Sequence, residues 1–334
     1  MRRTVIIIAS VVVSAAFLAL VLRDVPFSEV VDSAREADVF WLAMTFLFAT
    51  IGLWTRAIRW RGLLDWRIGQ RDAFLILGVT FLLNQLPLRV GEVARGLLAT
   101  QRGVPFVTAA TSIVVERMLD TLLVVVALLL AISQLPDVPP SVSGATGLFG
   151  VLGVIAFVVL VGFARYPDLA RRLVRLLGDL LPPLRRLPLE KLLDQLLDGL
   201  RPLTDPRRLA HAVIWSLISW AFSFSGMIAM LYALDILDVP LLLTSVLGVT
   251  LASFSVAIPV SVAAVGPFEA AIRVTGELVG MVDVEAVALG FIVHGMTVLA
   301  YIVWGVAGIV VLGVSVGDML RRAEQPDPQP EAKQ

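Results

Sequence analysis

Long apolar runs dominate the chain, and ionisable residues interrupt them at a few places. Residues 4–22 carry no charge, and residues 286–317 contain a single ionisable side chain, His294. A helix needs about 20 apolar residues to cross a bilayer. These runs predict membrane-spanning helices. A composition of 58% hydrophobic and 16% charged residues then favours an all-α polytopic membrane protein.

Further apolar runs of spanning length bring the predicted spans to six. The six runs are residues 4–22, 39–55, 104–135, 144–164, 212–234 and 286–313. We interpret the first as a retained span and not as a signal peptide. It exceeds the usual apolar region of about 7–15 residues, and no A-x-A-like cleavage site follows it.

The charges in the connections predict the orientation. Arginine is concentrated in residues 56–72 and 165–211 and near both termini, whereas the other connections are acidic or nearly neutral. Cytoplasmic loops are rich in Lys and Arg, so we expect both termini on the cytoplasmic side of a cell membrane. Residues 165–211 are expected to lie on the cytoplasmic surface as an amphipathic segment, or to act only as an anchor. Residues 317–334 are expected to be a disordered tail.

Two apolar segments, 73–88 and 241–264, contain residues that interrupt a helix. These breakers are Pro87 and Gly91 for the first segment and Pro259, Gly266 and Pro267 for the second. A short amphipathic piece follows each break, and a crossing there would no longer match the charge pattern. We therefore predict two re-entrant hairpins, which a membrane tolerates where the irregular backbone lines a cavity or is buried in protein.

The two halves of the chain correspond when the sequence is shifted by 177 residues. Glu92 then falls on Glu269, and Arg117 falls on His294. With the charge-based orientation, the units at about 39–135 and 212–313 become inverted copies of span, hairpin and span, within one transmembrane domain of residues 1–316. Inverted repeats with broken helices are a recurrent transporter design. The alternative is a duplicated scaffold without transport.

Polar and ionisable residues gather beside the two breaks and in the neighbouring spans. The candidate headgroup pathway consists of Asn84, Arg89, Glu92, Arg95, Glu116, Arg117, Asp120, Glu269, Arg273 and His294. Charges within a membrane are costly and usually mark a pathway. A helix that begins after a break also favours an anionic headgroup at its N-terminus. The alternative is structural: pairs that hold hairpin against span, and a histidine that is a satisfied core group.

Several classes of function find no support in the sequence. The net charge is zero, so nucleic acid is not an expected partner. The absence of cysteine excludes disulfides and thiolate metal sites, and two histidines make a histidine metal site implausible. No P-loop, dinucleotide fingerprint or H-E-x-x-H motif occurs. We expect no metal and no cofactor.

The residues at the breaks resemble a known family, the flippase-like lysylphosphatidylglycerol synthase transmembrane region. The resemblance covers about residues 5–316. The family includes the membrane half of the bacterial multiple peptide resistance factor. The pattern N-x-x-L-P-x-R-x-G-E-x-x-R, with Leu86 one position early, a following E-R-x-x-D and a later G-x-x-E are met by Asn84, Leu86, Pro87, Arg89, Gly91, Glu92, Arg95, Glu116, Arg117, Asp120, Gly266 and Glu269. Ala263 and Ala264 stand where the family usually has glycines, and His294 stands near a position that is often arginine.

The resemblance implies movement of phospholipids or lipid-linked headgroups between leaflets, with membrane lipids of anionic headgroup as partners. It does not imply the synthase reaction, which in two-part relatives belongs to a separate soluble domain. One alternative is a membrane-embedded lipid-modifying enzyme with Glu92 or Asp120 as general base. Another is a membrane subunit that serves a separate soluble enzyme. Enzymatic activity of this chain is the less favoured hypothesis.

Overall fold

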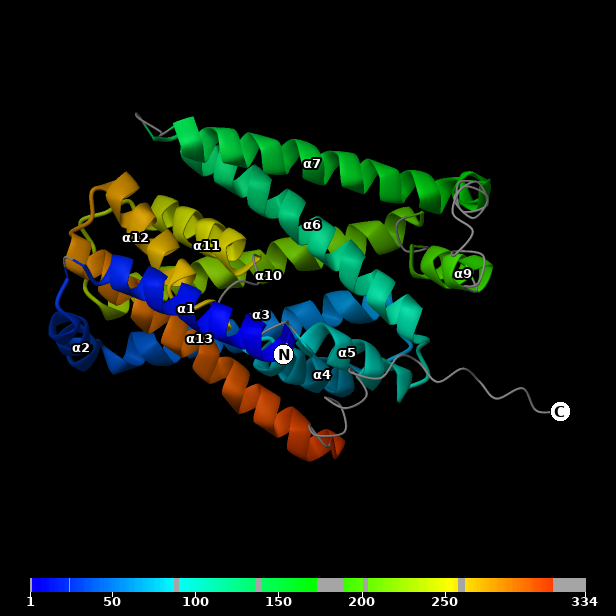
Figure 1. Cartoon of the computed structure of the whole chain (residues 1–334), viewed down its shortest axis with the longest axis horizontal. Coiled ribbons are helices and arrows are strands. Elements are labelled where there is room, and N and C mark those ends of the chain that lie inside the picture. The colour runs from blue at the N-terminus through cyan, green and yellow to red at the C-terminus, as the bar shows by residue number, and fades with distance from the viewer. Residues whose placement is uncertain are drawn as a thin grey trace.

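The computed structural model describes residues 2–23, 25–86, 90–135, 140–172, 189–200, 204–257 and 262–314, and within them the chain is helical without strands (Figure 1). The principal helices are α1 (Arg2–Val21), α2 (Phe27–Glu36), α3 (Val39–Leu63), α4 (Gln70–Leu83), α5 (Val90–Thr100), α6 (Phe106–Ile132), α7 (Pro140–Arg165), α9 (Leu189–Leu200), α10 (Pro206–Ala233), α11 (Leu241–Ala257), α12 (Pro267–Val279) and α13 (Asp283–Leu312). A short 3-10 turn, η4 (Val262–Ala264), precedes α12. The all-α prediction is confirmed for the described residues.

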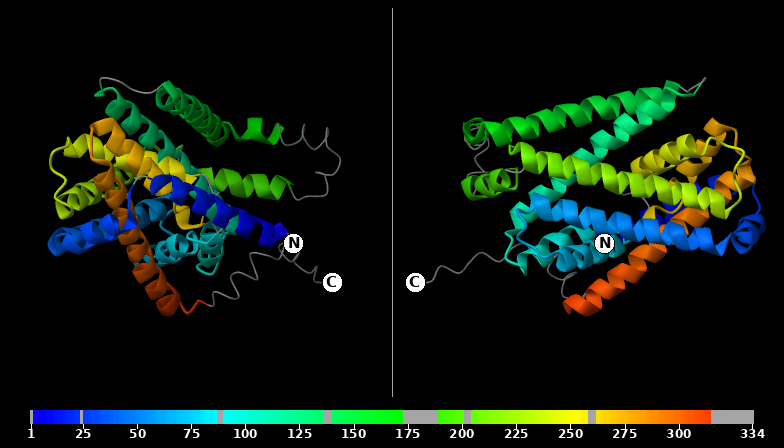
Figure 2. Two further views of the ribbon diagram at one scale, coloured as in Figure 1. Left: turned by 60° about the vertical axis from the view of Figure 1, so that its left-hand side comes forward. Right: turned by 180° about the vertical axis from the view of Figure 1, so that it is seen from behind.

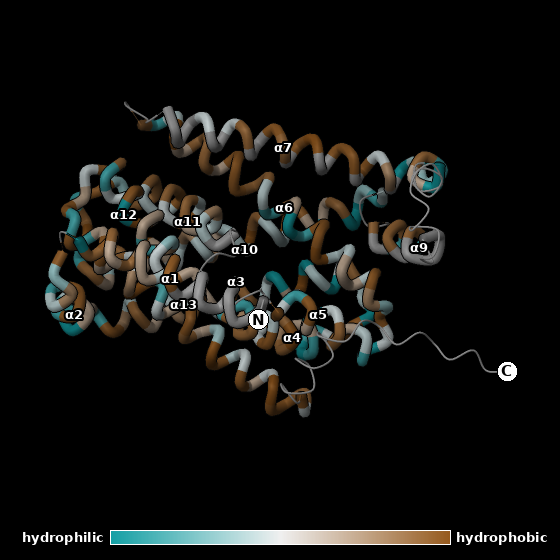
Figure 3. Tube along the Cα trace, viewed as in Figure 1, coloured by the Kyte–Doolittle hydropathy of each residue, from teal (hydrophilic) through white to brown (hydrophobic). Residues whose placement is uncertain are grey.

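A helix covers each of the six apolar runs that the sequence marks as spans. Three of them, α3, α10 and α13, are long and apolar enough to cross a membrane by length and composition. In α6, polar residues interrupt the apolar run near the middle of the helix, where Figure 3 shows hydrophilic positions between hydrophobic ones. That interruption places ionisable groups inside the helical bundle.

One predicted boundary was wrong, and the error changes the site. The apolar run predicts a span that ends at residue 55, with Arg56 and Arg59 in a cytoplasmic loop. The structure continues α3 to Leu63, and the Arg59 side chain is fully buried. The helix continues because partners on α6 and α10 satisfy the Arg59 guanidinium.

Helices α3 and α10 lie side by side along their whole length and run antiparallel (Figure 2, right). At one end the Asp38 N–H donates to the Ala233 carbonyl at 2.8 Å, and at the other Arg208 pairs with Asp65 at 2.9 Å. Between them Thr55 and Ser219 share a buried hydrogen bond of 2.9 Å. Small and hydroxyl residues let membrane helices approach closely, so this pair forms the central axis of the bundle.

The two ends of this pair differ in charge. One end, called here the arginine end, carries Arg61, Arg67, Arg71, Arg102 and Arg208. The opposite end, called the acidic end, carries Asp38, Asp235, Asp238, Asp283 and Glu285. Helix α4 begins at the arginine end, directly after α3, whereas α11 begins at the acidic end, directly after α10.

Helices α4 and α5 form a helical hairpin that returns to the arginine end. Arg102, just after α5, pairs at 2.7 Å with Asp72 in the first turn of α4. A side chain at Gly91 would overlap the Thr80 carbonyl oxygen, so this glycine allows α5 to pack against α4. Pro87 and Arg89 lie outside the described residues, as does Pro259 in the second break.

The second hairpin, α11 and α12, turns through backbone that favours glycine. Gly266 has φ of +93° and caps α12, and Pro267 is the first residue of that helix, as expected for a proline that starts a helix. Ala263 and Ala264 have φ of +52° and +58°, a region that costs an L-residue about 1–2 kcal/mol. Glycine adopts a positive φ without this strain. The alanines at these two positions, where the resembled family usually has glycines, therefore make the turn more strained.

We call α3 to α6 the first half of the molecule and α10 to α13 the second half. Each half packs its hairpin against the last helix of the other half. Helix α4 packs on α13, where Gly78 lies directly against the backbone of Trp304 and Gly305. Helix α11 packs in turn on α6. The hairpin tips also meet, since the Ala263 N–H donates to the Gln85 carbonyl at 3.1 Å. The remaining helices are peripheral: α1 and α2 cover α12 and α13, and α7 and α9 cover α6.

Candidate functional site

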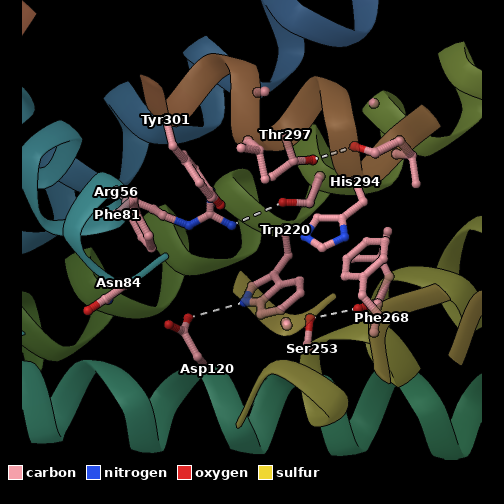
Figure 4. A pocket seen from close by; sticks show the side chains of 18 of the residues that line it. Arg56, Phe81, Asn84, Asp120, Trp220, Ser253, Phe268, His294, Thr297 and Tyr301 are labelled. Atoms are coloured by element: carbon pink, nitrogen blue, oxygen red, sulfur yellow. Dashed lines mark hydrogen bonds between the residues drawn. The ribbon is translucent and has the colours of Figure 1, made fainter. Parts of the chain in front are cut away.

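A cavity of about 360 Å³ lies between the two halves of the molecule, where the hairpin tips meet. Its wall is built from α3 to α6 of the first half and from α10 to α13 of the second (Figure 4). Six of the predicted pathway residues line it, namely Asn84, Glu92, Glu116, Arg117, Asp120 and His294. Residues from distant parts of the sequence therefore converge on one polar space.

Behind the α6 wall lies a buried ion cluster centred on Glu116. Arg95 binds the Glu116 carboxylate through both terminal nitrogens, at 2.7 and 3.4 Å, and Arg59 reaches it at 2.8 Å. Arg95 also lies over the Trp60 ring at 4.1 Å. Buried charges are tolerated when they are paired and hydrogen-bonded. Arg95 does not line the cavity and supports its wall.

Asp120 connects this cluster to the cavity. Its carboxylate accepts hydrogen bonds from the Arg59 guanidinium and, at 3.2 Å, from the Trp220 indole (Figure 4). The Arg59 Nη1 also donates to the Ser216 hydroxyl at 2.8 Å. Helices α3, α6 and α10 are thereby joined through one arginine, and the Asp120 carboxylate is held at the surface of the cavity.

Glu92 and Arg117 form a looser pair in the first half. Their side chains are 3.5 Å apart and keep 32% and 41% of their surface exposed. Both line the cavity. An exposed ion pair contributes little to stability, so this pair can separate at small cost.

Glu269 and His294 form a tighter pair in the second half. The Glu269 Oε1 lies 2.7 Å from the His294 Nδ1, and its Oε2 accepts from the Gly266 N–H at 2.7 Å. The Phe268 ring stacks on the imidazole with centroids 4.4 Å apart. Glu269 is buried behind His294, and only the histidine faces the cavity.

The two glutamates occupy the same place in their helices. Glu92 is the third residue of α5, and Glu269 is the third residue of α12. A carboxylate in the first turn also compensates the positive end of the helix dipole. The shift of 177 residues thus brings together residues with the same local role.

Arg273 lies away from the cavity. It donates to the carbonyls of Leu20 and Val21 at the end of α1 and pairs with Asp283 at 2.9 Å. These contacts tie α1 to the acidic end of the bundle. A pathway role for Arg273 stays a prediction. Arg89 lies outside the described residues.

Three residues of the site were missed by the sequence analysis: Arg56, Trp220 and Tyr301 line the cavity. The available signal for Arg56 was the absence of a helix breaker between Thr55 and Gly62. Arg56 and Arg59 lie one turn apart and follow the apolar run without interruption. Trp220 and Tyr301 carry no comparable signal, because aromatic residues inside apolar helices are ordinary.

Over the described ranges, no group of three His, Cys, Asp or Glu residues is arranged to hold a metal ion. Residues 7–305 match the model of the family described as Lysylphosphatidylglycerol synthase TM region. No curated protein and no solved structure matches the chain.

Proposed function

The chain belongs to the lysylphosphatidylglycerol synthase TM region family, and on that premise we propose that it moves phospholipid or lipid-linked headgroups between the leaflets of a membrane. The observation that carries the proposal is the charged cavity at the interface of the two halves. Ligand pockets typically span about 300–1,000 Å³, so a cavity of about 360 Å³ accommodates a headgroup. The acyl chains remain in the bilayer.

The architecture we propose has six spans and two re-entrant hairpins, arranged as an inverted repeat. Helices α4 and α5, with 14 and 11 residues, are about 21 and 17 Å long, shorter than the hydrocarbon core of about 30 Å. The two hairpins start from opposite ends of the antiparallel α3 and α10 pair. Positive-inside charge favours the arginine end as the cytoplasmic side of a cell membrane.

The transport step we propose uses the two carboxylate pairs as alternating barriers. The Glu269–His294 pair is tight, at 2.7 Å, and the Glu92–Arg117 pair is loose, at 3.5 Å. A headgroup that enters through the loose pair is released when the tight pair opens and the loose one closes. Inverted repeats support such exchange, because the two halves can adopt each other's conformation.

A catalytic role for the same residues has less support. Each of the carboxylates Glu92, Glu116 and Asp120 lies within ion-pairing distance of an arginine. A general base must be free to accept a proton from a bound substrate, whereas Glu116 and Asp120 are held by Arg95 and Arg59. The loose pair with Arg117 leaves Glu92 as the carboxylate on which the enzyme alternative rests.

A leaflet-translocation assay tests the proposal. The purified protein is reconstituted into vesicles that contain fluorescent phosphatidylglycerol or phosphatidylcholine, and a membrane-impermeant reductant quenches the outer leaflet. We expect quenching to exceed the outer-leaflet half for wild type and to stop near half for Glu92→Gln/Glu269→Gln. Glu36→Gln, an exposed change on α2, is the matched control and should behave as wild type.

Two results would contradict the proposal. Unchanged translocation by the double variant would remove the glutamates from the pathway. Quenching that stops near half for wild type, with and without an imposed membrane potential or proton gradient, would remove lipid translocation. Chemical change of the lipid by the purified protein would favour the enzyme alternative.

A further inference from the structure

Arg56, which lines the cavity, differs from the neighbouring arginines because it has no carboxylate partner among the described residues. Arg59, Arg95 and Arg117 each lie within 4 Å of a carboxylate. Arg56 lines the cavity and donates to the Ser223 hydroxyl at 3.1 Å. Across the part of the chain that the structure describes, no carboxylate lies within ion-pairing distance of it.

The carboxylates nearest to this wall are already paired with other arginines. Arg59, Arg95 and Arg117 pair with Glu92, Glu116 and Asp120. Glu269, across the cavity, is occupied by the Gly266 N–H and by His294. A charge inside a membrane protein is costly unless a partner compensates it. An anionic ligand group would supply that compensation.

The surroundings of Arg56 orient its guanidinium and add the Tyr301 hydroxyl as a further hydrogen-bond donor. Phe81 and Tyr301 stack on each other, with ring centroids 4.9 Å apart, and Figure 4 shows Arg56 beside both rings. Tyr301, Ser223 and Thr297 also line the cavity, but the Ser223 and Thr297 hydroxyls donate to the backbone carbonyls of Ser219 and Val293. The donors left for a ligand are the Arg56 guanidinium and the Tyr301 hydroxyl, and a guanidinium can bind a phosphate through two parallel hydrogen bonds.

The other polar part of the cavity presents acceptors. The carboxylates of Glu92 and Asp120 line the cavity, whereas the Asn84 Oδ1 is buried against Gly91 and is not accessible from it. Figure 4 shows Asn84 and Asp120 toward α6, and Arg56 and Tyr301 toward α13. Acceptors of this kind suit hydroxyl or amino groups at the far end of a phosphodiester.

We propose that Arg56 is the residue that binds the phosphate of the ligand in this cavity, while the hydroxyl or amino end of the ligand faces Glu92 and Asp120. The assignment of that phosphate to a lipid rests on the proposed function. The shared chemistry is a phosphate monoanion or diester, which a soluble headgroup or free phosphate also carries.

Equilibrium binding to the purified full-length protein in neutral detergent tests this proposal. The probes are dioctanoylphosphatidylglycerol, dioctanoylglycerol (the same chains without phosphate), glycerophosphoglycerol (the headgroup without chains) and inorganic phosphate. The variants are Arg56→Gln, which removes the charge, and Arg56→Lys, which keeps the charge without the planar fork. Arg71→Gln, an exposed arginine on α4, is the matched control.

We expect Arg56→Gln to weaken binding of dioctanoylphosphatidylglycerol by about tenfold or more, in line with the loss of a charge-assisted contact. Arg56→Lys should lie between Arg56→Gln and wild type, and Arg71→Gln should match wild type. Unchanged binding by a folded Arg56→Gln would overturn the proposal. So would an equal loss for dioctanoylglycerol, which would indicate a collapsed cavity.

The remaining probes separate the sources of the phosphate. Arg56-dependent binding of the lipid that is much tighter than that of glycerophosphoglycerol or phosphate supports a lipid ligand. Equal affinity for the soluble probes supports the anion site and overturns its assignment to a lipid. Binding is measured without transport, so a protein that binds through Arg56 and does not flip lipid contradicts only the proposed function. Wild-type flipping by Arg56→Gln contradicts only this inference.

Discussion

Glu269 and His294 stand 25 residues apart and share a buried contact of 2.7 Å. Arg117 lies at the same separation from Glu92, and these two side chains are 3.5 Å apart and partly exposed. The pairs occupy corresponding positions in the two halves but differ in closeness and burial. The transport step proposed above requires such a difference between the two pairs.

The first prediction concerns the energies of these two pairs. Double-mutant cycles with glutamine replacements should give a coupling of about 1–3 kcal/mol for Glu269 and His294, because both groups are buried. The cycle for Glu92 and Arg117 should give less than about 1 kcal/mol, because solvent screens an exposed pair. Unfolding midpoints in detergent provide the measurement. Equal couplings would mean that the two pairs are in the same state.

The second prediction concerns Arg59. Arg59→Met leaves the buried carboxylates of Glu116 and Asp120 short of a partner, which should destabilise the protein by about 3–5 kcal/mol. Further replacement of Asp120 by Asn should recover part of this loss. Arg71→Met, on the exposed surface of α4, should stay within about 0.5 kcal/mol of wild type. A small effect of Arg59→Met in thermal unfolding would exclude a structural role for the buried cluster.

The third prediction separates backbone strain from packing at the second break. Gly280 has φ of +75° and open space around it, so Gly280→Ala should cost about 1–2 kcal/mol from strain alone. Gly266 also has a positive φ, but a side chain there would overlap Phe17 and the Ser14 carbonyl of α1. Gly266→Ala should cost about 1–3 kcal/mol more. Equal losses in melting temperature would show that α1 does not pack on this turn.

The fourth prediction concerns water in the cavity. The chain contains no cysteine, so single cysteines can be introduced without background labelling. Ser253→Cys on α11 lines the cavity and should react with a charged thiol reagent. Thr250→Cys on the same helix is fully buried and should not react until the protein unfolds. Protection of Ser253→Cys in the folded protein would contradict an accessible polar cavity.

The fifth prediction concerns orientation. Gly69 and Asp238 are exposed positions at the arginine end and the acidic end. An impermeant maleimide applied to intact cells should label Asp238→Cys and leave Gly69→Cys unlabelled until the membrane is opened, because positive charge stays on the cytoplasmic side. The opposite labelling pattern would invert the proposed topology, and labelling of both from outside would contradict the spans between them.

The one-dimensional pattern was sufficient for several features of this protein. Long apolar runs and their breakers depend on local composition, so the all-α class, a helix over each of the six apolar runs and the start of α12 at Gly266-Pro267 followed from the sequence. The shift of 177 residues also placed Glu92 on Glu269 and Arg117 on His294. In the structure Glu92 contacts Arg117, and Glu269 contacts His294; these contacts were not predicted, and the repeat stays a prediction.

Only the tertiary structure decided which charged residues face the cavity and which support its wall. Arg95 and Glu269 follow the breaks as Glu92 does, yet they lie behind Glu116 and His294. Arg59 became a buried residue of α3 because its partners, Asp120 and Ser216, come from 61 and 157 residues away. The cost of burying a charge depends on such partners. Their approach is a property of helix packing, which the order of residues along one helix does not contain.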